Sequence, residues 1–229
     1  MKLAHAMIGI AEITGRRAIA LISDMSQPLG NAVGNAVEVM EACSVLNDTG
    51  PYDLTSVCVE LSCAMLELGD PSKTGCQVKQ SIFRQIDDRK AFAKLMELIR
   101  NQGGQFHEDG RIAFKEGGGK NDFYLAERAG YIEKIDAELV GKAALALGAG
   151  REKKEDAIDY RAGILFSKKV GDEIKPGEMI ALLEAADEKK IELSKKTLDE
   201  AITISDTKPK TLIRHILGKI TKDSEEINY

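Results

Sequence analysis

One short run of apolar residues, AIALIS at positions 18–23, constrains the fold of this chain more than any other feature. The run is continuously apolar and is bounded by Arg17 and Asp24. A short strand of this kind is typical of a parallel sheet that is covered on both faces. Apolar residues at helical spacing precede it over 3–13, and a glycine-bearing loop and a second helical pattern follow it. Helix, strand, loop and helix in this order predict an α/β fold.

The remainder of the first hundred residues has helical patterns. A stripe of apolar residues after Asp53, a candidate N-cap, predicts a helix that ends at Gly69 and Pro71. Two further helices are expected at 75–86 and 88–101, before the glycine pair at 103–104. We therefore expect 1–104 to be a partial α/β segment, mostly helical, with its one strand at 18–23.

The pattern changes after Gly104, where we place a boundary. Strands are expected at 131–136, 157–170 and 178–185, and helices at 137–147 and 188–202. The last two strands are joined by GDEIKPG, in which Pro176 and Gly177 supply turn chemistry. The predicted organisation is a segment 1–104, a C-terminal α+β segment 105–204 and a tail 205–229. We expect the first two segments to pack together, because the strand at 18–23 needs neighbours from 105–204 or from outside the chain.

Charge and cysteine content exclude several classes of protein. The 32 basic and 37 acidic residues are mixed along the chain and give a net charge of −5, which favours neither nucleic acid nor an anionic membrane as a partner. No apolar run reaches the roughly 18 residues of a membrane helix, and the start of the chain lacks the pattern of a signal peptide. The four cysteines form no C-x-x-C pair, and Cys43 and Cys58 are expected to be buried free thiols. A cytoplasmic location is predicted.

Four stretches of the sequence resemble a known enzyme family. They are ISDMSQPLGNAVGNAVEVMEA, KLMELIRNQGG, GYIEKIDAELVGKAALALGAGREKKEDAIDYRAGI and KKVGDEIKPGEMIALL. In order and spacing they resemble the C-terminal half of the pyrimidine-nucleoside phosphorylases, the group that includes thymidine phosphorylase. The resemblance covers nearly all of 1–204. It implies the C-terminal part of a large α/β domain, with helices packed on a mixed sheet, followed by a small α/β segment that contains a hammerhead-like hairpin.

The resemblance implies a reaction but assigns no catalytic or substrate-binding residue to this chain. In that family phosphate attacks the anomeric carbon of a pyrimidine nucleoside and gives a free base and a pentose 1-phosphate. The residues that hold phosphate and base lie in the N-terminal half, to which no part of this chain corresponds. The unaided sequence agrees, because neither of its two glycine-bearing candidates has the strand–turn–helix context of a phosphate site. EGGGKND at 116–122 is expected to be a flexible loop, and GAGREKK at 148–154 a solvated one.

The resemblance does imply a cation site. Main-chain oxygens and one carboxylate hold a monovalent cation, potassium, in the family, and these positions fall here on Leu29, Ala32 and Glu41. In an unbroken helix Leu29 and Glu41 would lie about 18 Å apart, so the cation geometry requires the helix to begin near Gly34 or Asn35. The alternative is that Gly30 and Gly34 form a small face packed against the sheet, with Val33, Val37 and Met40 in the core and Glu41 solvated. The remaining cation ligands belong to the missing half, so we expect weak binding and no firmly held cofactor.

Three functions are compatible with the sequence. The first is the C-terminal portion of a pyrimidine-nucleoside phosphorylase that is inactive alone. The second is a carrier module, because KKVGDEIKPGEMIALLEA is also similar to the hairpin of biotinyl and lipoyl domains, although Lys189 and Lys190 are expected in a helix. The third is a structural partner of a separate N-terminal half. The expected partner is that half or a second copy of the chain, bound through the residues Met7, Ile10, Ala18, Ala20 and Ile22.

Overall fold

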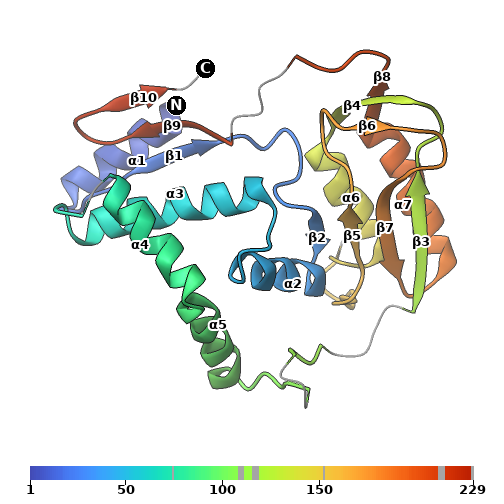
Figure 1. The fold of residues 1–229 in the computed structure, drawn as a ribbon, viewed down its shortest axis with the longest axis horizontal. Coiled ribbons are helices and arrows are strands. Elements are labelled where there is room, and N and C mark those ends of the chain that lie inside the picture. The colour runs from blue at the N-terminus through green and yellow to red at the C-terminus, as the bar shows by residue number, and fades with distance from the viewer. Residues whose placement is uncertain (74, 108–110, 115–118, 152, 211–214, 228–229) are drawn as a thin grey trace. The chain divides into compact units, whose positions relative to one another are not determined.

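A computed structural model describes residues 1–73, 75–107, 111–114, 119–151, 153–210 and 215–227 (Figure 1). Helices and strands together form the α/β class that the sequence predicts. Two compact units are present, the first formed by 1–24, 45–92 and 212–229 and the second by 25–44 and 93–211. This division differs from a boundary near Gly104. All strand pairs in the described ranges are antiparallel, so the expected mixed sheet is not observed there.

The first unit contains a sheet built from both ends of the chain. Its strand order is β1 (Ala20–Ser23), β9 (Ile216–Ile220) and β10 (Glu225–Ile227). Helix α1 (Lys2–Ile13) buries Ala4 and Ile8 against Ile220 in a small core. The side chains that flank this core on the strand side are Ala18, Ala20 and Ile22.

The prediction of a parallel strand at 18–23 is therefore wrong in its direction and its partner. β1 pairs antiparallel with β9, and Ala20 lies opposite Ile220. Its neighbour comes from the tail, not from 105–204 or from outside the chain. The strand is also only partly buried and is not covered on both faces as expected. A short apolar run predicts a strand, but it carries no information on the direction of the neighbouring strand.

Two long helices complete the first unit. Helix α3 (Tyr52–Gly69) begins after Pro51, and Asp53, the expected N-cap, lies in its first turn, where a carboxylate favours the helix dipole. Helix α4 (Cys76–Asp87) packs against it, and Lys79 and Glu60 join the two helices by an ion pair of 2.6 Å. Helix α5 (Lys90–Asn101) follows in the chain, and from Ala93 onward it belongs to the second unit. None of the helices in the described part of the chain is long and apolar enough to cross a membrane.

The second unit places two helices on one sheet. Strands β2 (Ala32–Gly34), β5 (Gly163–Phe166), β7 (Met179–Ala185) and β3 (Lys120–Leu125) form the sheet in this order. Helices α6 (Ala137–Leu147) and α7 (Glu188–Ala201) pack against each other and against this sheet (Figure 1). A second sheet has the order β6 (Glu173–Ile174), β4 (Gly130–Ile135) and β8 (Ile202–Ser205). Buried aliphatic side chains from all these elements except β2 and β3 make one continuous core.

The expected hairpin is present in this unit, with two additions. β5 and β7 pair antiparallel, as the two runs joined by GDEIKPG predict. Strand β6 lies between them in the chain and pairs with β4 instead. The glycine-rich stretch 116–122 was expected to be a loop, but Lys120–Asp122 belong to β3, while 116–118 lie outside the described residues. The pairing of β2 with β5 also joins the segments 1–104 and 105–204, as predicted.

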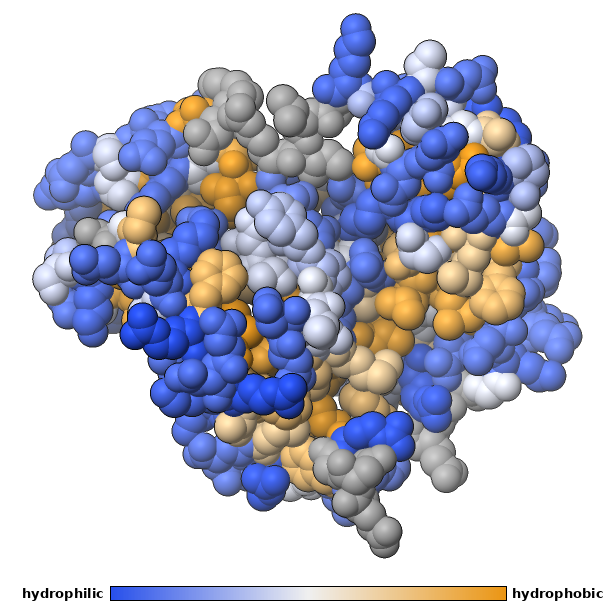
Figure 2. All heavy atoms as spheres, viewed as in Figure 1, coloured by the Kyte–Doolittle hydropathy of each residue, from blue (hydrophilic) through white to orange (hydrophobic). Residues whose placement is uncertain are grey.

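One face of the four-stranded sheet carries an apolar row. Leu182 of β7 lies opposite Leu165 of β5 on one side and opposite Phe123 of β3 on the other. Leu165 and Phe123 are exposed, and Figure 2 shows apolar atoms gathered over these strands.

Tyr124 on β3 makes the stability of the second unit depend on pH. Burial raises the pKa of the Tyr124 phenol above its ordinary value of 10.0, as does the hydrogen bond of 2.9 Å that its hydroxyl donates to Asp199. A raised pKa favours the protonated form in the folded state, so this stabilisation is present below about pH 10 and is lost as the pH rises further. Urea unfolding should show that wild type loses stability relative to Tyr124→Phe between about pH 8 and about pH 11. Tyr160→Phe, at an exposed tyrosine, should follow wild type.

Candidate functional site

The site that the sequence nominates is the loop between Gln27 and Gly34, which folds back over helix α2 (Ala36–Val45). The helix begins at Ala36, as the cation geometry requires, and Gly30 adopts φ 70°, a left-handed conformation that favours glycine. The Glu41 carboxylate is 8% exposed, and its Oε1 atom accepts the amide hydrogens of Asn31 at 2.7 Å and Ala32 at 3.1 Å. Glu41 therefore holds the loop against the second turn of the helix.

The alternative explanation of the two glycines is not supported. It requires Glu41 in solvent and Met40 in the core, whereas Glu41 is buried and Met40 is 49% exposed. The close packing that it expects does occur at Gly34, where a Cβ atom would lie 2.7 Å from the carbonyl oxygen of Ala162, the residue before β5. The loop thus reverses direction, as the cation geometry requires, and also packs closely against its neighbour at Gly34, as the alternative expects.

Strand register shows which way the backbone of Ala32 faces. The amide of Phe166 donates to the carbonyl oxygen of Asn31 at 2.8 Å, so this carbonyl faces β5, while the Asn31 amide donates to Glu41. The next pair, Ala32 and Leu165, is then a non-hydrogen-bonded pair. The amide and carbonyl of Ala32 therefore point away from β5, toward the edge of β2 on which Glu41 lies.

Residues far along the chain hold the same loop, and no sequence pattern predicted them. The Lys169 ammonium donates to the carbonyl oxygen of Gly30 at 2.6 Å and also to that of Pro28. The amide of Val170 donates to Oε1 of Gln27 at 3.3 Å. These contacts cross more than a hundred residues, and KKVGD has no local pattern that distinguishes Lys169 from a solvated turn lysine.

The donor set of Leu29, Ala32 and Glu41 fits a hard monovalent cation by type. Carbonyl and carboxylate oxygens are the ligands that such cations prefer. The structure brings the Glu41 carboxylate to the backbone of Ala32, and Leu29 lies between the two residues whose carbonyls Lys169 binds. Within the described residues, no group of three or more His, Cys, Asp or Glu side chains could hold a metal ion. Cation binding therefore depends on main-chain oxygens and stays a prediction.

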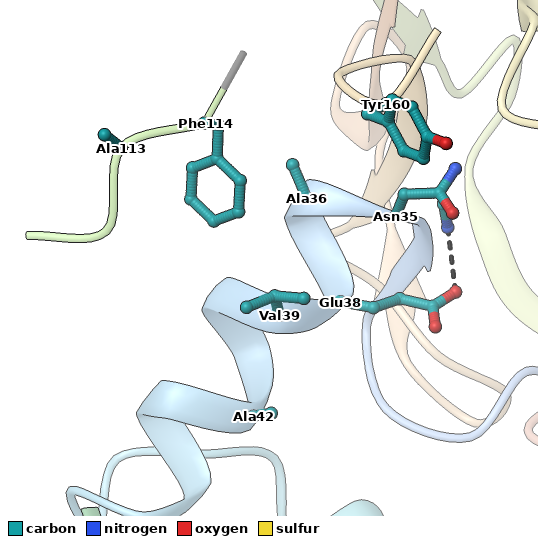
Figure 3. A pocket seen from close by; sticks show the side chains of 9 residues that line it. Asn35, Ala36, Glu38, Val39, Ala42, Ala113, Phe114 and Tyr160 are labelled. Carbon is teal, nitrogen blue, oxygen red and sulfur yellow. Dashed lines mark hydrogen bonds between the residues drawn. The ribbon is translucent and has the colours of Figure 1, made fainter. Parts of the chain in front are cut away.

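A shallow hollow of about 670 Å³ lies beside the start of α2 (Figure 3). Its lining is mostly apolar and includes the side chains of Val39, Phe114 and Tyr160. Glu38 is the charged side chain among the lining residues, and its Oε1 atom accepts the Gly34 amide hydrogen at 2.9 Å. The described residues that line this hollow offer contacts to an apolar group, and none of them is a cation that would neutralise phosphate.

The structure also describes the cysteines and the lysines that the sequence singled out. The structure has no disulfide at any of the four cysteines. Cys43 is half-buried and not fully buried as predicted, and burial raises the pKa of its thiol, which disfavours the reactive thiolate. Cys58 is exposed, so the prediction that it is buried is wrong. Lys189 and Lys190 lie in the first turn of α7, not on a tight turn between strands, and intact mass would reveal a carrier group on either.

The chain is similar in sequence to known proteins. Residues 131–205 match the pyrimidine nucleoside phosphorylase C-terminal domain. A pyrimidine-nucleoside phosphorylase of Staphylococcus haemolyticus is 38% identical over 216 residues, which are 94% of this chain and 50% of that protein. One of Staphylococcus epidermidis is 39% identical over 219 residues, with the same shares. One of Staphylococcus aureus is 37% identical over 207 residues, 89% of this chain and 47% of that protein. The chain thus spans about half the length of the curated relatives that it matches.

Proposed function

Because the chain belongs to the pyrimidine-nucleoside phosphorylase family, whose C-terminal half it matches, we propose that it supplies the C-terminal portion of such an enzyme. A phosphate oxygen attacks the anomeric carbon of a pyrimidine nucleoside, and the bond from that carbon to the base nitrogen breaks. The base leaves and takes up a proton, and pentose 1-phosphate remains. The observation that carries this proposal is similarity over 94% of the chain to relatives of that name. The setting is the cytoplasm, without nucleic acid or membrane as a partner.

Residues 1–229 are inactive alone under this proposal. Displacement by phosphate depends on groups that neutralise its charge and align it with the sugar. At the loop 27–34, the Glu41 carboxylate and the Lys169 ammonium are both directed at the loop backbone. Among the described lining residues of the hollow beside α2, the charged group is the carboxylate of Glu38. The missing groups come from the half of the relatives that this chain does not span, which is therefore the partner.

The expected result is that the purified chain releases no base from uridine or thymidine in the presence of phosphate. Adding the separately expressed N-terminal half of the S. epidermidis relative should produce base and pentose 1-phosphate in equal amounts. Chromatography measures the released base, with and without phosphate, for the chain alone and for the mixture. Phosphate-dependent release by the chain alone, abolished by mutating one of its own residues, would disprove the assignment of catalysis to the other half.

Helix α1 provides the surface for this partner. Its large side chains Leu3, Met7 and Ile10 form an exposed face beside the one that buries Ala4 and Ile8, and Ile10 is 63% exposed. An exposed apolar face of this kind marks an association surface. Ala18, Ala20 and Ile22, which the sequence placed in the same contact, pack instead against the small core of the first unit. Ile10→Asp should therefore reduce the activity recovered in the mixing assay. Leu193→Asp, which likewise replaces an apolar side chain by a carboxylate but lies on α7, should not.

The cation belongs to the same proposal. Leu29, Ala32 and Glu41 supply part of a potassium site, and the other ligands come from the partner half. Bound potassium would fix the loop ahead of α2. The three residues alone form an incomplete shell, so the chain by itself should bind potassium weakly.

A further inference from the structure

Lys169 occupies an unusual place for a lysine in a turn. It lies between β5 and β6, is half buried, and directs its ammonium inward at the carbonyl oxygens of Pro28 and Gly30. The adjacent Val170 amide binds the side chain of Gln27, so this turn holds the loop at two points. A lysine loses considerable side-chain entropy when it is fixed in this way. The contacts of Lys169 with the loop must therefore contribute enough favourable free energy to offset that loss.

Glu41 holds the same backbone through groups of opposite polarity. Its Oε1 atom accepts the amide hydrogens of Asn31 and Ala32, while Lys169 donates to the carbonyl that precedes them, at Gly30. Carbonyl oxygens also point in this way at a bound alkali ion. Here two of them point at the positive charge of the ammonium. The ammonium at 2.6 Å from the Gly30 oxygen therefore does here what an ion would do.

We propose that Lys169 is the resident cation of this loop. Its ammonium fixes the carbonyls of Pro28 and Gly30, so the loop keeps its shape without a bound ion. Its charge also repels potassium from the neighbouring oxygens of Leu29, Ala32 and Glu41, and thereby lowers the affinity of the site. The second part rests on the cation site of the proposed function, while the first part concerns this chain alone.

Ion-dependent stability of the full chain tests this proposal. Thermal unfolding is followed in potassium chloride and in tetramethylammonium chloride at equal ionic strength, because tetramethylammonium is too large to enter an oxygen cage. The variants are Lys169→Met, which removes the charge and the donors, Lys169→Arg, which keeps the charge, and Lys168→Met. The last is a matched control, because the neighbouring Lys168 pairs with Glu178 and not with the loop.

Wild type, Lys169→Arg and Lys168→Met should each unfold at the same temperature in the two salts. Lys169→Met should unfold earlier in tetramethylammonium chloride and recover saturably as potassium replaces it, since a ligand that binds only the folded state stabilises it. Thallium(I), a potassium analogue with a useful NMR signal, should bind Lys169→Met about tenfold more tightly than wild type once the repulsion is gone. Adding Glu41→Gln to Lys169→Met should abolish the potassium response.

Three outcomes would overturn the proposal. One is that Lys169→Met is destabilised but does not respond to potassium, which makes Lys169 a tether only. Another is that wild type responds to potassium as strongly as Lys169→Met. The third is that the response survives Glu41→Gln, so that the ion binds elsewhere. None of these readouts uses base release, so failure of the mixing assay leaves them interpretable.

Discussion

Leu198→Ala should destabilise the second unit by about 2–5 kcal/mol, the range for a buried leucine replaced by alanine. Leu198 lies on α7 in the core between the helices and the sheets, and it is 0% exposed. The substitution removes buried apolar surface and leaves a cavity that packed neighbours fill only in part. Urea unfolding, followed by circular dichroism, measures the difference in free energy of unfolding.

Leu193→Ala on the same helix is the control for this substitution. Leu193 is 55% exposed, so the same chemical change should shift the free energy of unfolding by about 0.5 kcal/mol or less. Equal effects of the two substitutions would contradict the placement of α7, because they would mean that both of its faces are equally covered.

Gly34→Ala should destabilise the same unit by about 1–3 kcal/mol, the cost of inserting a group where there is no room. Gly34 ends β2 opposite Gly163, and the two strands approach closely there. A Cβ atom on Gly34 would lie 2.7 Å from the Ala162 carbonyl oxygen, and one on Gly163 would lie 2.9 Å from the Val33 carbonyl oxygen. Both obstacles are backbone atoms, so neither can turn aside as a side chain would.

Gly141→Ala should stabilise the second unit, in contrast to Gly34→Ala. Gly141 lies inside α6, and a Cβ atom there would meet nothing within 4 Å. Alanine is favoured over glycine inside a helix by about 0.5–1 kcal/mol, so the variant should be more stable than wild type. Chemical unfolding of both variants under the same conditions measures the two free energies of unfolding. If Gly141→Ala lost as much stability as Gly34→Ala, the lack of space for a Cβ atom would not explain the effect at Gly34.

The sequence predicted the helices and the central hairpin well because their signals are local. α6 lies at 137–147 as expected, since Asp136 caps it by accepting the amide hydrogens of Glu138 and Leu139, and Gly148 ends it in a left-handed conformation. The β5 and β7 pair follows from two apolar runs separated by turn residues. These patterns occur within a few residues of one another, where sequence spacing determines geometry.

The sheet that contains β1 was not predicted because its signal is not local. Its partner β9 has the short run HILGKI at 215–220, which in isolation has no feature that relates it to 18–23. The same holds for the loop at 27–34. Its chain reversal was implied by the family resemblance, because the residues alone also allowed a small glycine face packed against the sheet. Lys169 approaches the loop from a distant turn and could not be inferred.

The pairing of β1 with β9 also determines when the first unit can fold during synthesis. Ser23 lies opposite Ile216, so β1 leaves the ribosome long before its partner exists. At about 5–20 residues per second, the delay is on the order of tens of seconds. The second unit has most of its sequence made within that interval, whereas Ala20 and Ile22 remain without their strand neighbour. Nascent chains of this protein therefore expose an apolar strand for a period set by translation rate, and slowing translation should lengthen their dependence on chaperones.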